Sequence, residues 1–290
     1  ETMNETVNET MNETMNEKGE TGTAKPMSFR LDSVDIYSQE ERLAADLYLP
    51  EVEGKPPVVV MAHGFGARRH FGLPPFAERF AAAGLAVLLF DYRGFGDSGG
   101  LPRNYVNPAR HLQDWQAAVQ TARTLPAVDG GRLALWGTSF SGGHVLLTAA
   151  RQPGIRAVVV QVPFVDGISS ASVFPKATLP LAVARIAADI AAELSGRSRV
   201  LVPVVASAGL RCLAGPDCEQ AVLRLVPEGM EFDNAVPARI LLDTDFYRPT
   251  TELSRIQAPV LMVGARHDSI VPYGAVQRAA GKIRDCRLEA

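Results

Sequence analysis

The sequence predicts an α/β fold with a mostly parallel sheet and helices on both faces. Short, uncharged apolar runs alternate with amphipathic segments, a pattern typical of buried parallel strands joined by helices. One such run, at 132–136, leads into a turn of small residues and then an apolar helix. With 290 residues, 47% of them hydrophobic, the chain can bury one large core and a modest inserted subdomain.

The first half of the chain shows a regular order of strands and helices. Residues 29–37 and 42–49 predict two strands paired as a hairpin around 38–40. Buried strands are predicted at 57–62 and 86–90. The remaining elements expected of the sheet and its covering layers are a helix over 75–83, a helix that begins at Asn107-Pro108 and buries Leu112, Trp115, Val119 and Ala122, and strands at 132–136, 157–162 and 260–263.

The alternation breaks down between Val162 and Pro259. A helix is predicted over 179–194, where Arg185, Asp189 and Glu193 recur every four residues as one polar stripe on an otherwise apolar helix. So wide an apolar face must either be buried against another part of the protein or itself cover a site. We therefore expect 164–250 to be a mainly helical cap over the carboxyl edge of the sheet, where ligands bind in open α/β folds. A half-domain unrelated to the site is the alternative.

The expected domains are a tail over 1–26, a core formed by 27–163 and 251–290, and the cap. The tail repeats ETMN with few apolar residues, so disorder is expected there. Formal net charge is −3, and no basic run occurs, so nucleic acid is not an expected partner. No apolar run is long enough to span a membrane, and no signal peptide is visible. The three cysteines fit a reducing cytoplasm.

The small-residue turn after 132–136 has the form of a nucleophile elbow with Ser139 at its tip. A serine hydroxyl is a poor nucleophile at neutral pH, so it must project from a sharp turn where a base can reach it. The residues two before and two after must be small, and here they are Gly137 and Ser141. The motif is thus GxSxS instead of GxSxG. A Gly/Ser-rich loop without chemistry is the alternative interpretation.

Three motifs in order resemble the α/β-hydrolase family over about 27–290. HGFG at 63–66 follows the third strand, DYRGFGDS at 91–98 matches the DxRGxGxS loop, and GTSFSGG at 137–143 is the elbow. Within that family, RNYVNPARHLQDW, GTSFSGGHV and YRP look most like the dienelactone-hydrolase-like and polyketide-transferase-like branch. The fold this implies is the α/β-hydrolase fold with a helical cap insertion.

The resemblance implies a role for each residue around the elbow. Ser139 attacks a carbonyl carbon, and the backbone N–H groups of Phe65 and Phe140 stabilise the oxyanion. Asp268, directly after the strand at 260–263, is the expected acid that orients a histidine. Asp166, after the preceding strand, is the alternative acid. An ordinary loop aspartate that caps the next helix is the alternative interpretation of Asp268.

The catalytic histidine is the missing element of this pattern. In the family it follows the acid on a loop beyond the last strand, and no histidine follows Asp268 here. Residues 286–290 resemble the start of that strand, so we expect a chain truncated before the histidine loop, with a true loss of the base as the alternative. Little or no turnover is expected of the chain as given. The histidines present are His63, His70, His111, His144 and His267. We expect His63 to support its loop and His144 to pack in the core.

Cofactors and metals are not expected. Residues 94–99 spell G-x-G-x-x-G after a strand, as dinucleotide-binding loops do. In those loops a helix begins at the glycines, whereas here Gly100-Leu101-Pro102 intervenes and the helix starts near Pro108. No cluster of His, Cys and Asp has the spacing of metal ligands.

The sequence leaves three functions open. The first is a serine hydrolase that acts on a small-molecule carboxylic ester or thioester through an acyl-enzyme on Ser139. The second is an acyltransferase that uses the same acyl-enzyme but excludes water. The third is a non-catalytic binding protein on an α/β-hydrolase scaffold. A prolyl peptidase is not expected, because such relatives carry large additional domains.

Overall fold

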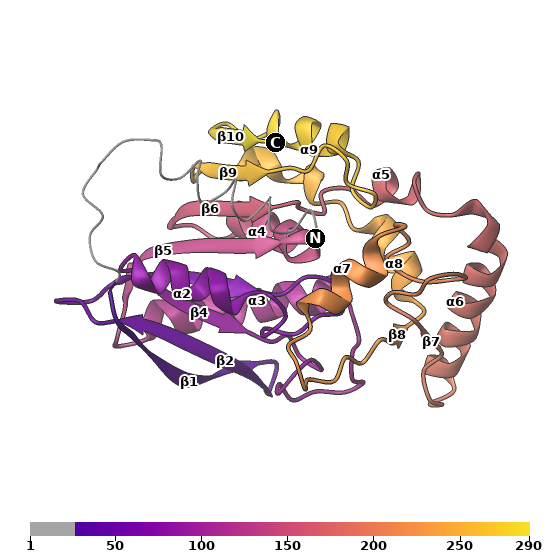
Figure 1. Cartoon of the computed structure of the whole chain (residues 1–290), viewed down its shortest axis with the longest axis horizontal. Coiled ribbons are helices and arrows are strands. Elements are labelled where there is room, and N and C mark those ends of the chain that lie inside the picture. Colours follow the sequence, from indigo (N-terminus) through magenta and orange to yellow (C-terminus); the bar gives the residue numbers. More distant parts are fainter. Residues whose placement is uncertain (1–26) are drawn as a thin grey trace, which may run out of the picture.

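A computed structural model describes residues 27–290, which form an eight-stranded sheet with helices on both faces (Figure 1). The predicted α/β class is confirmed. The strand order is β1-β2-β4-β3-β5-β6-β9-β10. The ETMN repeat and its expected disorder lie outside the described residues.

The sheet contains a hairpin and a parallel set of strands. β1 pairs antiparallel with β2, which pairs antiparallel with β4, and all later pairs in the sheet are parallel. β2 is therefore the strand that runs against the others. The eight strands of the sheet are β1 (Phe29–Ser38), β2 (Glu41–Pro50), β3 (Pro57–Ala62), β4 (Ala86–Phe90), β5 (Asp129–Thr138), β6 (Ile155–Gln161), β9 (Val260–Val263) and β10 (Cys286–Glu289).

The helices and remaining strands connect and extend this sheet. β7 (Leu201–Val202) and β8 (Val236–Pro237) form a separate two-stranded sheet. The α-helices are α2 (Pro74–Ala82), α3 (Pro108–Thr124), α4 (Ser139–Arg151), α5 (Gly167–Ala171), α6 (Leu179–Leu194), α7 (Cys218–Leu225), α8 (Ile240–Phe246) and α9 (Tyr273–Ala280). The 3₁₀ turns are η1 (Lys176–Thr178), η2 (Pro249–Thr251) and η3 (Leu253–Arg255).

Local sequence explains the hairpin and the start of α3. Gln39 and Glu40 have φ of +50° and +69°, as two-residue hairpin turns require, and they close the Ser38–Glu41 pair. Asn107 accepts a hydrogen bond from the main chain of Arg110 at 3.0 Å, so the predicted N-cap is confirmed.

The central strands are buried on both faces because alternate side chains enter two cores. On β3, Val58 and Val60 face the core that contains α3 and α4. Val59 and Met61 face the smaller core under α2. This two-sided burial explains why these strands are continuous apolar runs in the sequence.

The elements from α5 to α8 lie beyond the carboxyl ends of the strands, to the right in Figure 1. α6 spans Leu179–Leu194, as predicted. Its polar stripe does not uniformly face solvent, however, because Asp189 is fully buried while Arg185 is exposed. The Asp189 carboxylate binds the Arg199 guanidinium, at 2.7 and 2.8 Å, and the main-chain N–H groups of Val200 and Arg239.

The apolar surface of α6 is divided as a result. Ala182 and Ile186 face inward, and Leu179 and Val183 lie at the edge of a cavity described below. Leu194 remains exposed. The buried carboxylate thus sets which side of α6 faces the protein. Across 27–290, no helix combines the length and apolar character needed to cross a membrane.

Replacing Asp189 should destabilise the protein much more than replacing Arg185 on the same stripe. Asp189→Ala leaves the partly buried Arg199 and two main-chain N–H groups without their acceptor, so the free energy of unfolding should fall by about 3 kcal/mol. Arg185→Ala is the matched control and should change it by less than about 0.5 kcal/mol. Urea unfolding followed by circular dichroism measures both, and equal effects would contradict the assignment.

Candidate active site

Ser139 lies at the junction of β5 and α4 in a strained conformation. Its φ is +53°, a left-handed value that a non-glycine residue adopts at a cost of about 1–3 kcal/mol. Its carbonyl accepts a hydrogen bond from the main chain of Phe164 at 2.8 Å, which ties the turn to the segment after β6. A serine on a strained strand-to-helix turn has the geometry of a nucleophile elbow.

The residues beside Ser139 show why this turn needs small side chains. A Cβ on Gly137 would lie 2.7 Å from Val145 Cγ2 and 2.8 Å from the Ser141 carbonyl oxygen. Ser141, where the common motif has glycine, is fully buried, and its hydroxyl accepts a hydrogen bond from Tyr92 at 3.0 Å. Tyr92 in turn accepts one from the indole of Trp115 at 2.9 Å. The exchange of glycine for serine therefore adds a hydrogen bond to the core beneath the elbow.

The 63–66 loop approaches Ser139 from β3. A Cβ on Gly64 would lie 3.3 Å from Ser139 Cβ and 3.8 Å from its Oγ, so the loop main chain passes directly beside the hydroxyl. The rings of Phe65 and Phe140 meet edge to face, with centroids 5.4 Å apart. The two proposed oxyanion donors thus belong to segments that are in contact next to Ser139.

A cavity of about 390 Å³ opens at Ser139. Phe65, Phe140 and Asp268 also line it, and most of its wall is apolar. Further walls come from α5, from α6, from the segment 212–215 and from α8. Its charged lining residues are two carboxylates, Asp245 and Asp268, and no lysine, arginine or histidine of the described chain lines it. The residues 164–250 therefore share one cavity with the proposed nucleophile.

Asp268 lies in the loop between β9 and α9. Its Oδ1 accepts hydrogen bonds from the main chains of Ile270 and Val271, both at 2.8 Å. These bonds fix the carboxylate, and α9 begins only at Tyr273, so Asp268 orders the loop and does not cap the helix. The hydrogen bonds of Asp268 within the described chain all involve Oδ1, which leaves Oδ2 available for an imidazole.

Asp166, the alternative acid, is occupied elsewhere. It caps α5 through the main chain of Ser169 at 3.0 Å, and it accepts from Thr250 Oγ1 at 2.9 Å and from Arg248 Nε at 3.0 Å. It does not line the Ser139 cavity. Burial opposes ionisation of Asp166, but these hydrogen bonds together lower its pKa. The geometry thus favours Asp268 over Asp166.

The histidines lie where structural roles place them. His63 is buried beside Asp91, His144 is fully buried in α4, and His267 is exposed. His70 contacts Asp46 at 3.2 Å. The expected scaffold role of His63 and packing role of His144 agree with their burial.

His144 belongs to a buried polar chain that the sequence did not reveal. Its Nδ1 lies 2.6 Å from the Tyr247 hydroxyl, and its Nε2 lies 3.3 Å from Nδ1 of His111. His111 stacks on Tyr92 with ring centroids 3.9 Å apart. Burial lowers the pKa of His144 to about 3 and that of His111 well below its usual value. Both rings are therefore neutral, and each contact needs only one donor.

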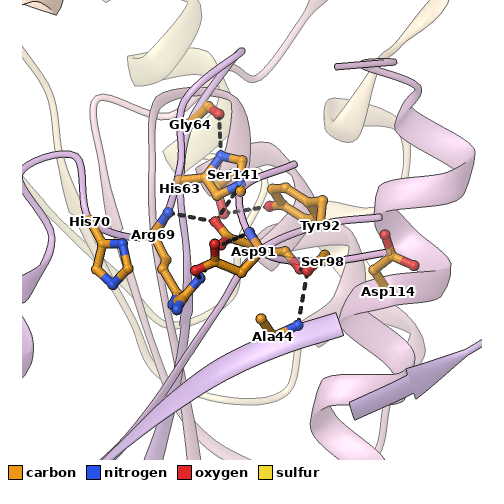
Figure 2. Close-up of polar contacts among 12 residues, drawn as sticks. Ala44, His63, Gly64, Arg69, His70, Asp91, Tyr92, Ser98, Asp114 and Ser141 are labelled. Atoms are coloured by element: carbon orange, nitrogen blue, oxygen red, sulfur yellow. Dashed lines mark hydrogen bonds and ion pairs between the residues drawn. The ribbon is translucent and has the colours of Figure 1, made fainter. Parts of the chain in front are cut away.

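A second buried network surrounds Asp91 (Figure 2). Arg69 contacts the carboxylates of Asp91 and Asp46, and Asp91 also faces His63. A Cβ on Gly96 would collide with the Asp91 carboxylate, which explains that glycine. The G-x-G-x-x-G pattern therefore closes a loop around a carboxylate, and α3 begins only at Pro108. Within 27–290, no group of three or more potential ligands is placed to hold a metal ion.

The sheet, the strained serine turn and the flanking loops define an α/β-hydrolase. The model of the X-Pro dipeptidyl-peptidase (S15) family matches residues 40–280, and the chain belongs to this family, although its sequence did not lead us to expect a prolyl peptidase. The chain is 41% identical over 256 residues to the quorum-quenching protein AidA of Acinetobacter baumannii, covering 88% of this chain and 83% of AidA.

Two further proteins are similar over smaller or more divergent regions. The thiohydrolase aneE of Aspergillus aculeatus is 33% identical over 188 residues, which cover 60% of this chain and 57% of aneE. The crystal structure of the alpha/beta hydrolase GrgF from Penicillium sp. sh18 matches with a TM-score of 0.76 at 24% identity, over 90% of this chain and 89% of GrgF. The structural match confirms the predicted α/β-hydrolase fold.

The buried neutral histidines predict a loss of stability in acid. The unfolded chain protonates His144 near pH 6.5, whereas the folded chain does so only near pH 3, so stability is full above pH 6.5 and falls as the pH drops below it. At pH 5 this group alone should lower the free energy of unfolding by about 2 kcal/mol relative to pH 7. His63 and His111 act in the same direction.

A variant separates this effect from other titrations. His144→Gln should reduce the difference in the free energy of unfolding between pH 7 and pH 5 by about 2 kcal/mol, because the contribution of the His144 ring disappears. Urea unfolding at both pH values measures it, and an unchanged difference in His144→Gln would show that this ring does not titrate as described.

Proposed function

We propose that this α/β-hydrolase cleaves a carboxylic ester or thioester through an acyl-enzyme on Ser139. The observation that carries the proposal is the position of Ser139: it lies on a strained turn, with φ of +53°, and its side of the turn lines a cavity that Asp268 also lines. The relative named a thiohydrolase supports the thioester in particular.

The proposed residues have distinct roles in the reaction. Ser139 Oγ attacks the carbonyl carbon and loses its proton to a base, and the carbonyl oxygen becomes an oxyanion. The main-chain N–H groups of Phe65 and Phe140 stabilise that charge. Collapse of the intermediate expels the alcohol or thiol, and attack by water on the acyl-enzyme releases the acid. Asp268 is placed to orient an imidazole as the base, although no histidine of residues 27–290 lines the cavity.

The cavity indicates the substrate class. Its wall is mainly apolar, so an aliphatic or aromatic acyl group fits it. Asp245 and Asp268 are its charged lining residues, and no lining side chain of the described part is cationic. An acyl group with a second carboxylate would meet like charge there without compensation. We therefore propose an uncharged small-molecule ester or thioester.

The same reasoning assigns roles to the segments of the chain. We propose that 27–163 and 251–290 form the catalytic core and that 164–250 is a cap whose helices α5, α6 and α8 wall the acyl pocket. This proposal is supported by the position of these helices beyond the strand ends (Figure 1) and by their contribution to the cavity. The free thiols of Cys212, Cys218 and Cys286 support a cytoplasmic location.

One observation favours a second candidate, a binding protein without catalysis. No histidine of the described chain lines the Ser139 cavity, so residues 27–290 present a nucleophile and an acid without a base beside them. If Ser139 is catalytic, a small exogenous base should substitute. If the protein only binds its ligand, no base will produce turnover.

We expect slow hydrolysis of p-nitrophenyl butyrate by this chain and a marked increase on addition of imidazole. Imidazole can enter beside Ser139 and accept its proton, as general bases contribute about 10²–10⁴-fold to such reactions. The rate is measured spectrophotometrically after subtraction of the imidazole-catalysed background. Ser139→Ala should abolish both the slow rate and the rescue, and a rescue that persists in Ser139→Ala would contradict the assignment of the nucleophile.

Substrate charge provides a separate test. With imidazole present, a p-nitrophenyl ester of a medium-chain acid should react at least about tenfold faster than the half-ester of the dicarboxylic acid of equal length, because the pocket holds no cation for the second carboxylate. Asp245→Asn should narrow this ratio, and Asp285→Asn, outside the pocket, should not. Equal rates for the two esters in the unaltered protein would contradict the proposed substrate class.

The choice between hydrolysis and acyl transfer has its own test. If an added alcohol yields a new ester as the main product, the protein is an acyltransferase.

A further inference from the structure

Arg69 connects the loop beside Ser139 to three separate carboxylates. Its guanidinium lies 2.8 Å from Asp46 on β2, contacts Asp91 after β4, and lies 2.9 Å from Asp97. Arg69 is 7% exposed and Asp91 is fully buried. Burial alone would lower the pKa of Arg69, but the carboxylates raise it, so the side chain is cationic. The neighbouring Arg68, by contrast, makes a more exposed contact with Asp233.

Asp91 also contacts the main chain of this loop. Its Oδ1 accepts a hydrogen bond from the Arg69 N–H at 2.7 Å and lies 3.6 Å from His63 Nε2 (Figure 2). Asp91 thus holds the Arg69 end of the segment 63–69 by a hydrogen bond and lies beside its His63 end. Between these ends lies Gly64, whose backbone passes beside Ser139.

The protonation of His63 shows which residue balances the charge of Asp91. His63 Nδ1 lies 3.0 Å from the Gly64 carbonyl oxygen, which only accepts, so Nδ1 carries the proton. Burial lowers the pKa of His63, so the ring is neutral and Nε2 presents a lone pair to Asp91. His63 therefore cannot neutralise this carboxylate, and Arg69 does so.

We propose that Arg69 and Asp91 are positioning residues that hold the 63–66 loop at the distance from Ser139 that the oxyanion requires. This inference rests on the function proposed above. The loop has little freedom, because a Cβ on Gly64 would lie only 3.3 Å from Ser139 Cβ and a Cβ on Gly66 would clash with Val204 at 2.9 Å. Oxyanion donors act only within narrow limits of distance, so a displacement of about 1 Å weakens them strongly.

Two ligands distinguish positioning from general stability. Butylboronic acid reports on the oxyanion donors: Ser139 Oγ bonds to the trigonal boron, its proton leaves to solvent, and an oxygen of the anionic, tetrahedral adduct points at the donors. N-phenyl-1-naphthylamine, which is neutral and apolar, reports on the cavity alone. Both dissociation constants are measured by fluorescence in the full chain: that of N-phenyl-1-naphthylamine directly, and that of butylboronic acid by its displacement of the naphthylamine.

Asp91→Asn and Arg69→Lys should raise the dissociation constant of butylboronic acid by about tenfold or more and leave that of N-phenyl-1-naphthylamine unchanged. Arg69→Lys keeps the charge and decides the question if Asp91→Asn does not fold. Arg68→Lys is the matched control: it makes the same exchange at the neighbouring arginine, whose contact is with the exposed Asp233, and should change neither constant.

Folded Asp91→Asn and Arg69→Lys proteins that bind the boronic acid as the unaltered chain does would overturn the inference. Equal weakening of the binding of both ligands would also overturn the inference, because that result would indicate a purely structural role. If the unaltered chain binds the naphthylamine but binds boronic acid no better than Ser139→Ala does, the proposed function itself fails. The two failures are thereby distinguished.

Discussion

The close approach of main chains around Ser139 is the constraint on which the site depends. Ser139 has a left-handed φ of +53°, and the segments on both sides of it pack too closely for larger residues: a Cβ on Gly137 would lie 2.7 Å from Val145 Cγ2, and one on Gly64 would lie 3.3 Å from Ser139 Cβ. The strain stored in the turn is offset by the packing of α4 and by the Tyr92–Ser141 hydrogen bond beneath it. The strained turn and its rigid support thus belong to one arrangement.

Features with short-range causes could be predicted from the sequence. The elbow, the buried strands and the helix 179–194 each have a local pattern, and the resemblance pointed to Asp268 in the loop after β9, which the structure places in the cavity wall. The orientation of α6 could not be predicted, because Asp189 meets Arg199 and Arg239 only in the folded chain. A stripe spaced by four indicates a helix face but does not say what covers it.

The two buried networks had no signal in the sequence for the same reason. Arg68 and Arg69 are adjacent and chemically identical, yet one makes a more exposed contact and the other lies among carboxylates from separate elements. Equally, His144 resembles any histidine on an apolar helix until Tyr247 is placed 2.6 Å away. Partners separated by tens of residues decide whether a polar side chain is a surface group or a buried support.

The central claim is that Ser139 forms an acyl-enzyme, and intact-protein mass spectrometry tests it most directly. Because no histidine of the described chain lines the cavity, water should attack the acyl-enzyme slowly and the adduct should accumulate. After incubation with p-nitrophenyl butyrate, we predict one added butyryl group, located by peptide mapping at Ser139 and lost in Ser139→Ala. An unmodified protein, or a butyryl group on another residue with Ser139 unmodified, would contradict the account.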